Sequence, residues 1–175
     1  PSTEEVPMQH ASVIRVLHNA WRFAAAGLLV LIAVPAAAGD AKGTVVYKGR
    51  TVEVKHAFLV AGPDVMTKQK MRRVILATKD LSARIATCKT MGCTDGELTE
   101  GLSINLEDGP RISYWMVMND QKVQYSGTEP KGSLALKTDD AKKVAGTLRF
   151  DKTAAGGPKV DVEFDAAMVK EVNAL

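Results

Sequence analysis

Histidine and cysteine are both scarce in this sequence of 175 residues, which contains three histidines and two cysteines. Only one histidine, His56, lies beyond residue 38. Any site that needs two imidazoles is therefore excluded from residues 39–175. His56 is also the single candidate in that range for a catalytic scheme that uses histidine as a base.

The sequence also lacks an apolar run long enough for a membrane span. The uncharged run at residues 23–34 has 12 residues, which is too short to cross a bilayer core of about 30 Å as a helix. Arg15 and Arg22 precede this run, and a proline and three alanines follow it. Basic residues, an apolar middle and small residues at the end are typical of a secretory signal. We therefore predict an export signal over residues 1–38.

Cleavage of this signal is predicted between Ala38 and Gly39, because small residues occupy the positions that signal peptidase recognises. Met8 offers an alternative start of translation. The protein is then expected to be bacterial and either periplasmic or secreted. Residues 39–175 would form a single exported domain with no transmembrane span after processing.

The overall composition is that of an ordinary globular domain. Hydrophobic residues make up 46% of the chain and charged residues 25%, which excludes a disordered or collagen-like protein. The net charge of +3 is too small to indicate a partner. The length fits one domain, or one domain and a processed segment.

Alternating apolar and polar residues recur through the chain beyond residue 43. The segments are 44–48, 52–60, 73–78, 102–106, 112–118, 123–125, 134–136, 144–150 and 160–164. Short segments of this kind, about ten residues apart with turn residues between them, are typical of a sandwich or a barrel. We predict an all-β, antiparallel, immunoglobulin-like β-sandwich of about 8–9 strands, with a small β-barrel as the alternative.

The same pattern makes several local predictions. Asp80 is expected to cap a short helix, residues 127–132 to form a loop, and residues 166–175 to extend the last strand or form a helix. One face of the second strand is expected to carry Val52, Val54, His56, Phe58 and Val60. A core stripe on a later strand is expected to carry Ile112, Tyr114, Met116 and Met118.

Several strand segments resemble an uncharacterised group of secreted bacterial β-rich proteins. The similar segments are Gly43-Thr-Val-Val-Tyr-Lys-Gly49, His56-Ala57-Phe58, Val74-Ile-Leu-Ala-Thr-Lys-Asp80, Val144-Ala-Gly-Thr-Leu148 and Lys159-Val-Asp-Val-Glu-Phe-Asp-Ala166. The resemblance covers most of residues 39–175. It implies a β-rich fold and an exported location, and it implies no activity.

Cys88 and Cys93 lie five residues apart. Two nearby cysteines in an exported protein usually form a disulfide, because the compartment is oxidising. Reduced, the pair could instead bind Cu(I) with Met91 as a third soft ligand. A redox-active pair is less expected, since thioredoxin-type chemistry favours a C-x-x-C spacing.

His56 is predicted to lie on the apolar face of its strand, where an imidazole needs a hydrogen-bond partner. It could be a ligand or a general base that faces a pocket, or a structural residue of the core. Ser103 and Ser113 could complete a catalytic triad, but the sequence has no G-x-S-x-G motif to identify a nucleophile.

A local basic cluster consists of Lys68, Lys70, Arg72 and Arg73. It could contact an anionic surface such as lipid headgroups or an acidic polymer. The alternative is a solvated loop and an edge strand protected by charge. Nucleic acid is not an expected partner, because of the compartment and because no aromatic residues alternate with the cations.

Three carboxylates, those of Asp161, Glu163 and Asp165, alternate along the last predicted strand. A strand spreads such residues about 7 Å apart, which disfavours one calcium ion. We expect a solvent-facing row that pairs with Arg149 or with lysines of the neighbouring strand.

Three functions remain from the sequence. The first is a non-enzymatic exported protein that binds an envelope component or a small ligand and needs no cofactor. The second is a copper-handling protein that uses Met91 with reduced Cys88 and Cys93, or His56 with methionines. The third is a small hydrolase with His56 as its base.

Overall fold

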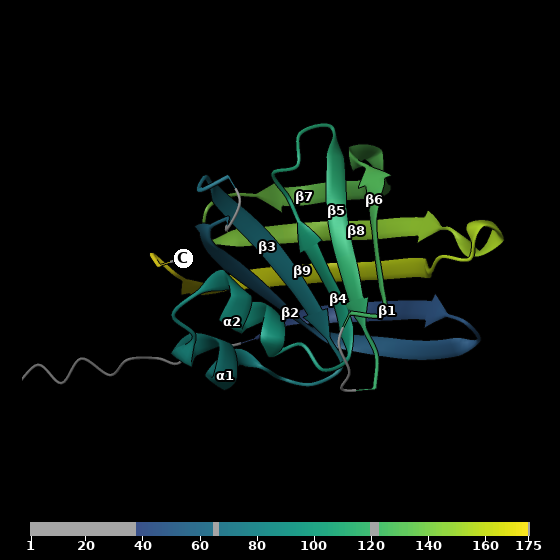
Figure 1. Ribbon diagram of the computed structural model, residues 1–175, viewed down its shortest axis with the longest axis horizontal. Helices are drawn as coiled ribbons and strands as arrows, with labels where there is room; N and C mark the ends of the chain where they lie inside the picture. Colours follow the sequence, from purple (N-terminus) through teal and green to yellow (C-terminus); the bar gives the residue numbers. More distant parts are fainter. Residues whose placement is uncertain (1–37, 65–66, 120–122, 175) are drawn as a thin grey trace, which may run out of the picture. The chain divides into compact units, whose positions relative to one another are not determined.

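The computed structural model describes residues 38–64, 67–119 and 123–174 (Figure 1). The export signal predicted over residues 1–38 therefore lies outside the described residues, apart from Ala38. The alternative start at Met8 also lies outside them.

Nine strands form one sheet in the order β6-β5-β4-β3-β2-β1-β9-β8-β7. Their bounds are β1 (Gly39–Tyr47), β2 (Arg50–Pro63), β3 (Lys70–Ala77), β4 (Gly101–Asn105), β5 (Arg111–Val117), β6 (Tyr125–Pro130), β7 (Leu134–Asp139), β8 (Lys143–Asp151) and β9 (Lys159–Glu171). Neighbours in this order are antiparallel, and the second half of β2 also pairs in parallel with β9. The predicted all-β class is confirmed.

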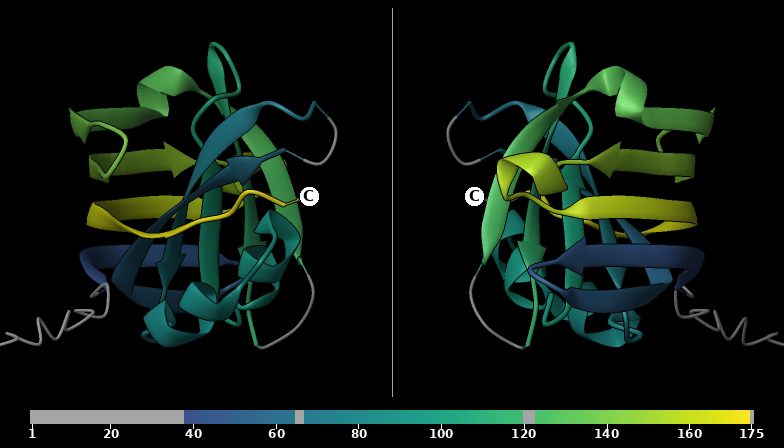
Figure 2. Two further views of the ribbon diagram at one scale, coloured as in Figure 1. Left: turned by 90° about the vertical axis from the view of Figure 1, so that its left-hand side faces the viewer. Right: turned by 90° about the vertical axis from the view of Figure 1, so that its right-hand side faces the viewer.

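The predicted sandwich of two sheets is not confirmed, because hydrogen bonding runs without a break from β6 to β7. The single sheet curls instead, so that strands β3–β6 lie across strands β7–β9 (Figures 1 and 2). Within the described residues β6 and β7 are the two edges of the sheet, so a closed barrel is not confirmed either. A short 3-10 turn, η1 (Lys131–Ser133), joins these two edge strands.

The inner face of the curled sheet encloses the main core. The predicted stripe on β5 and just beyond it is confirmed, since Ile112, Tyr114, Met116 and Met118 are all buried there. The ring centroids of Tyr114 and Phe150 lie 4.8 Å apart. These rings connect β5 and β8, which five strands separate in the sheet. The curled sheet thus encloses a core with one of its faces, whereas a sandwich encloses its core between the faces of two sheets.

The apolar side chains of β2 do not share one face, so that prediction is wrong. Val54 packs in the inner core, whereas Phe58 packs in a second apolar cluster on the outer face. The register between β1 and β2 shifts between Asp40 and Gly43. The extra residue of this bulge lies on β1, which bends there. In β2 the residues of the inner core pass from Val54 to Ala57, a step of three, so the alternation changes around His56. The outer cluster covers the other face of the second half of β2.

Two short helices contribute to the outer cluster (Figure 1). Helix α1 (Ser82–Thr87) is present as the sequence predicts, but its N-cap is Leu81, and Asp80 bonds to the N–H of Ser82 from one position earlier. Helix α2 (Met91–Gly96) was not predicted. The cluster contains Phe58, Val60, Met71, Ile75, Ala77, Leu81, Ile85, Met91, Leu98, Val117 and Val172. In the part of the chain described here, no helix has the length and apolar character that a membrane crossing requires.

Two further boundaries differ from or refine the predictions. Residues 125–130 form the edge strand β6 rather than a loop, because they pair along β5 despite their glycine and proline. Pairing with β5 therefore makes this segment a strand, although its local sequence has only a weak preference for one. Strand β9 continues to Glu171, so the end of the chain extends the strand instead of forming a helix.

Candidate functional site

A polar groove of about 470 Å³ lies beside helix α1. It brings together the start of β2, the connection between β3 and α1, and the segments that precede β4 and follow β5. The lining residues are Arg50, Lys79, Asp80, Leu81, Arg84, Thr99, Glu100 and Asn119. Its volume lies within the range of about 300–1,000 Å³ that is usual for small-molecule sites.

Two of the three cations that line this groove form ion pairs. Arg50 pairs with Glu100, and Arg84 on α1 pairs with Glu97. Lys79 is exposed, and among the described residues it has no carboxylate partner. The groove therefore presents one ammonium group that has no ion-pair partner among the described residues.

Asp80 stabilises the wall of the groove. Its Oδ1 accepts a hydrogen bond of 2.8 Å from the backbone N–H of Ser82, at the start of α1. Hydrogen bonds from the backbone and side chain of Ser82 lower the pKa of Asp80, and the nearby His56 lowers it further. The carboxylate thus serves the helix start and stays ionised.

Replacing Asp80 with alanine is expected to destabilise the fold by about 1 kcal/mol near neutral pH, the usual net value of one hydrogen bond. Because folding lowers the pKa of Asp80, its contribution is present above the ordinary value of 3.8. It is lost as the pH falls through the lowered folded value. Thermal unfolding of both proteins from pH 7 to pH 2 measures this, and a gap that persists at the lowest pH would contradict it.

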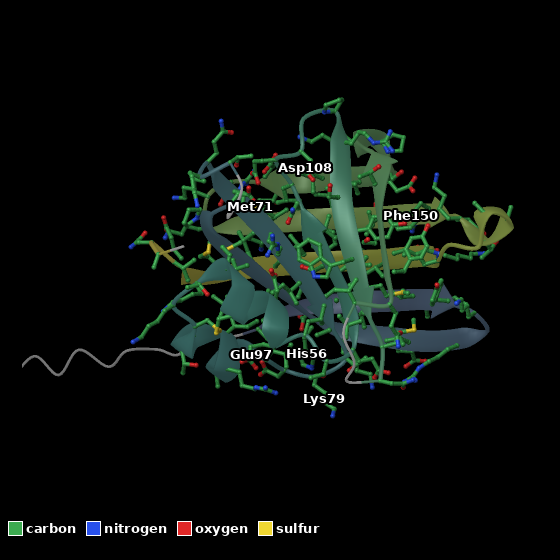
Figure 3. All side chains as sticks on the ribbon, viewed as in Figure 1. His56, Met71, Lys79, Glu97, Asp108 and Phe150 are labelled. Atoms are coloured by element: carbon green, nitrogen blue, oxygen red, sulfur yellow. A yellow bond between two sulfur atoms is a disulfide. The ribbon has the colours of Figure 1, made fainter. Side chains whose placement is uncertain are left out.

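His56 is half-buried on β2, opposite Ala77 of β3. Figure 3 labels it at the same end of the molecule as Lys79 and Glu97. Its ring lies 6.4 Å from that of Phe58.

The predicted serine partners of His56 lie on other strands. Ser103 is fully buried on β4, and Ser113 lies on β5 opposite Asn105. The structure therefore brings His56 together with Asp80, a residue that the sequence analysis treated only as a helix cap.

A second hollow of about 370 Å³ adjoins the groove, and both are lined by Arg50. Its other lining residues are Tyr47, Lys48, Met118 and Gln124. The ammonium nitrogen of Lys48 lies 5.3 Å from the centroid of the Tyr47 ring. This hollow adds an aromatic ring and a further cation to those of the groove.

Cys88 and Cys93 form the predicted disulfide, with an S–S distance of 2.07 Å. It links the end of α1 to α2. Met91 is buried in the outer cluster, where its side chain packs over Gly62. The third possible ligand near the two sulfurs is the carboxylate of Glu97, since one ligand atom from each of these three residues lies within 4.8 Å of the others.

The basic cluster predicted on residues 68–73 does not form one cationic surface. Lys68 is exposed in the loop before β3, and Lys70 pairs with Glu171. Arg72 and Arg73 point to opposite faces, as consecutive strand residues do. β3 lies between β2 and β4, so the alternative of an edge strand protected by charge is wrong.

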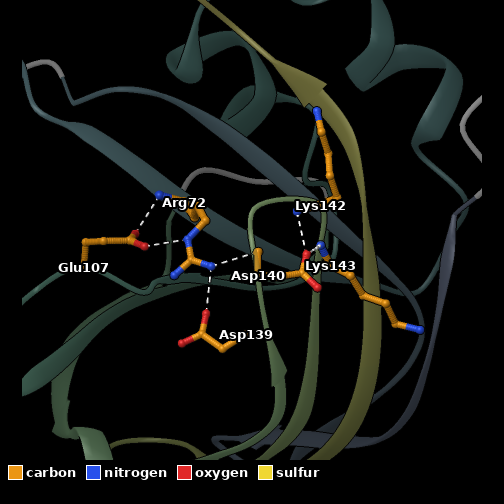
Figure 4. Close-up of polar contacts among 6 residues, drawn as sticks. All are labelled: Arg72, Glu107, Asp139, Asp140, Lys142 and Lys143. Carbon is orange, nitrogen blue, oxygen red and sulfur yellow. Dashed lines mark hydrogen bonds and ion pairs between the residues drawn. The ribbon is translucent and has the colours of Figure 1, made fainter.

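Arg72 binds carboxylates at one end of the sheet, on its inner side (Figure 4). Its Nε donates to Glu107 at 2.7 Å, and its terminal nitrogen donates to Asp139 at 2.7 Å and to the carbonyl of Asp140 at 3.0 Å. These contacts connect β3 to the turn between β7 and β8. Arg72 therefore acts in the fold, and its charge is already paired.

Arg73 is buried under helix α2. Its guanidinium pairs with both oxygens of Asp95, donates to Asn105 at 2.7 Å and lies 4.2 Å from the centroid of the Trp115 ring. Burial raises the pKa of Asp95, although the charge of Arg73 acts in the opposite direction. This pair attaches α2 to the sheet.

The acidic row on β9 pairs across the sheet as the sequence predicts. Asp161 pairs with Arg149 and Asp165 with Lys143 of β8, while Glu163 pairs with Lys137 of β7. The row is a solvent-facing ladder of ion pairs.

Sequence reasoning missed the groove because its residues come from distant segments. Arg50 and Glu100, for example, are separated by 50 positions. The one local signal was Asp80, which the sequence places at the start of a helix and which lines the groove in the structure. Comparisons with protein families, with curated proteins and with solved structures found no match.

Proposed function

We propose that the protein is a non-enzymatic, exported binding protein of the bacterial periplasm or exterior, with a sandwich-like curled sheet as its scaffold. The groove beside α1 is its ligand site. The observation that carries this proposal is the groove itself, which has the volume of a small-molecule site and holds one cation, Lys79, without a carboxylate partner among the described residues.

Two observations support the proposed export. Among the described residues the first strand begins at Gly39, the residue that would follow the predicted cleavage site, and the nine strands described all lie in the segment that would remain. The disulfide between Cys88 and Cys93 suits an oxidising compartment. The resemblance to secreted β-rich proteins belongs to the same proposal.

A copper-handling function stays a second hypothesis, with Glu97 as a ligand near the cysteines in place of Met91. Metal binding there would require a reductant to open the disulfide and the release of Glu97 from Arg84. The hydrolase hypothesis has less support, because the candidate nucleophiles Ser103 and Ser113 lie on β4 and β5, whereas His56 lies on β2.

Expression of the full chain in a bacterial host tests the proposal. We expect the exported protein to have the mass of residues 39–175 less two hydrogens under denaturing conditions. Under native conditions we expect additional mass from a bound small molecule. A chain with alanine 38 replaced by arginine (Ala38→Arg) should remain unprocessed, because signal peptidase needs a small residue there. Wild-type protein that stays unprocessed in the cytoplasm would contradict export.

A further inference from the structure

We propose that the groove and the adjoining hollow form one site for a small amphiphilic anion, an organic carboxylate or phosphate with an apolar body. The acidic group would lie at Lys79 and Arg50, and the apolar body against Tyr47. This inference rests on the proposed binding function of the groove.

Charge is the first argument. Four cations surround the two hollows, namely Lys48, Arg50, Lys79 and Arg84. Three carboxylates face them, those of Asp80, Glu97 and Glu100. Among the described residues, the two hollows together therefore carry one more cation than carboxylates, and an anionic ligand would compensate this charge.

The position of the unpaired charge is the second argument. Arg50 and Arg84 already have carboxylate partners, while Lys79 lines the same groove as Arg50. The carboxylate of Asp80 is adjacent in the chain, but it accepts hydrogen bonds from Ser82. A ligand anion therefore meets an available ammonium group with a guanidinium nearby, which suits a carboxylate or phosphate.

The second hollow supplies the apolar half. Tyr47 presents a partly buried ring that packs against the inner core and lines this hollow. Aromatic rings bind apolar groups well. Because Arg50 lines both hollows, a single ligand can place its charged end in one and its apolar end in the other.

Nuclear magnetic resonance titration of the exported, isotope-labelled protein tests this site. The probes are phenyl phosphate, inorganic phosphate and benzyl alcohol. We expect phenyl phosphate to shift the amide signals of residues 47–50 and 79–81, with a Kd about tenfold below that of inorganic phosphate, as burial of a phenyl group implies. Benzyl alcohol should bind more weakly than phenyl phosphate by about the same factor.

Two lysine variants give the matched comparison. Lys79→Gln should raise the Kd for phenyl phosphate about tenfold, the effect of about 1.4 kcal/mol from a charged hydrogen bond. Lys89 is also exposed and lies in the turn between α1 and α2. Lys89→Gln should leave the Kd unchanged. Unchanged amide signals elsewhere in both variants establish that each keeps the fold.

Three results would overturn the inference. Equal Kd values for phenyl phosphate and inorganic phosphate would show that the second hollow does not bind an apolar group. Binding of benzyl alcohol as tight as that of phenyl phosphate would remove the anion and leave the proposed binding function in place. Unshifted groove signals with every probe would count against both the inference and the groove as a ligand site.

Discussion

Replacement of Arg73 by alanine is expected to destabilise the folded protein by about 3 kcal/mol, because it leaves Asp95 partly buried without its counter-charge. The arginine side chain is 7% exposed and that of Asp95 29% exposed. The variant also loses the hydrogen bond to Asn105 and the stacking of the guanidinium on Trp115. Urea unfolding of both proteins measures the difference in the free energy of unfolding.

The pH dependence of this effect has a definite sign. Burial raises the pKa of Asp95 in the wild type, and loss of Arg73 raises it further. A raised folded pKa means that the ionised form costs stability, so the deficit of the variant is full above that pKa. The deficit shrinks as the pH falls toward the ordinary carboxyl value, because a protonated Asp95 needs no counter-charge.

Arg149→Ala provides the control for this prediction. Arg149 pairs with Asp161 on the exposed ladder, and exposed pairs contribute little to stability. We expect no measurable change in its unfolding. If Arg73→Ala unfolded at the same urea concentration as Arg149→Ala, the proposed attachment of α2 by the buried pair would be wrong.

Replacement of Gly43 by alanine is expected to cost about 3 kcal/mol or more, from backbone strain and overpacking together. Gly43 has a φ of +145°, which other residues rarely adopt, and an added Cβ would lie 2.1 Å from the carbonyl oxygen of Asp161. β1 lies between β2 and β9, with its bulge at this glycine. A clash here therefore disturbs both pairings, and thermal unfolding measures the loss.

Gly92→Ala is the matched control. No atom lies within 4 Å of the Cβ that alanine would add there. Alanine also favours a helix more than glycine does, by up to about 1 kcal/mol. We expect this variant to be as stable as the wild type or slightly more so. A Gly43→Ala protein that matched it would show that the bulge tolerates a side chain.

The sequence could predict the features that depend on neighbours along the chain. The alternation around Tyr114 indicates a strand with one buried face, because successive strand residues point to opposite sides. The spacing of Cys88 and Cys93 allows a disulfide within one turn between helices. The acidic row at Asp161 and its partner Arg149 follow from hairpin pairing of adjacent strands. In each case the interacting groups are local or lie in consecutive strands.

Features that join distant segments were decided only by the tertiary structure. The alternation of β2 changes around His56, which places Phe58 on the outer face, and no period in the sequence of β2 records this change. The curl of one sheet, in place of two sheets, depends on contacts such as that of Tyr114 with Phe150. The candidate site arises in the same way, because Arg50, Lys79 and Glu100 meet only after β2, β3 and β4 have paired. Local side-chain patterns determine strands and their buried faces, whereas long-range packing determines which charged groups share a groove.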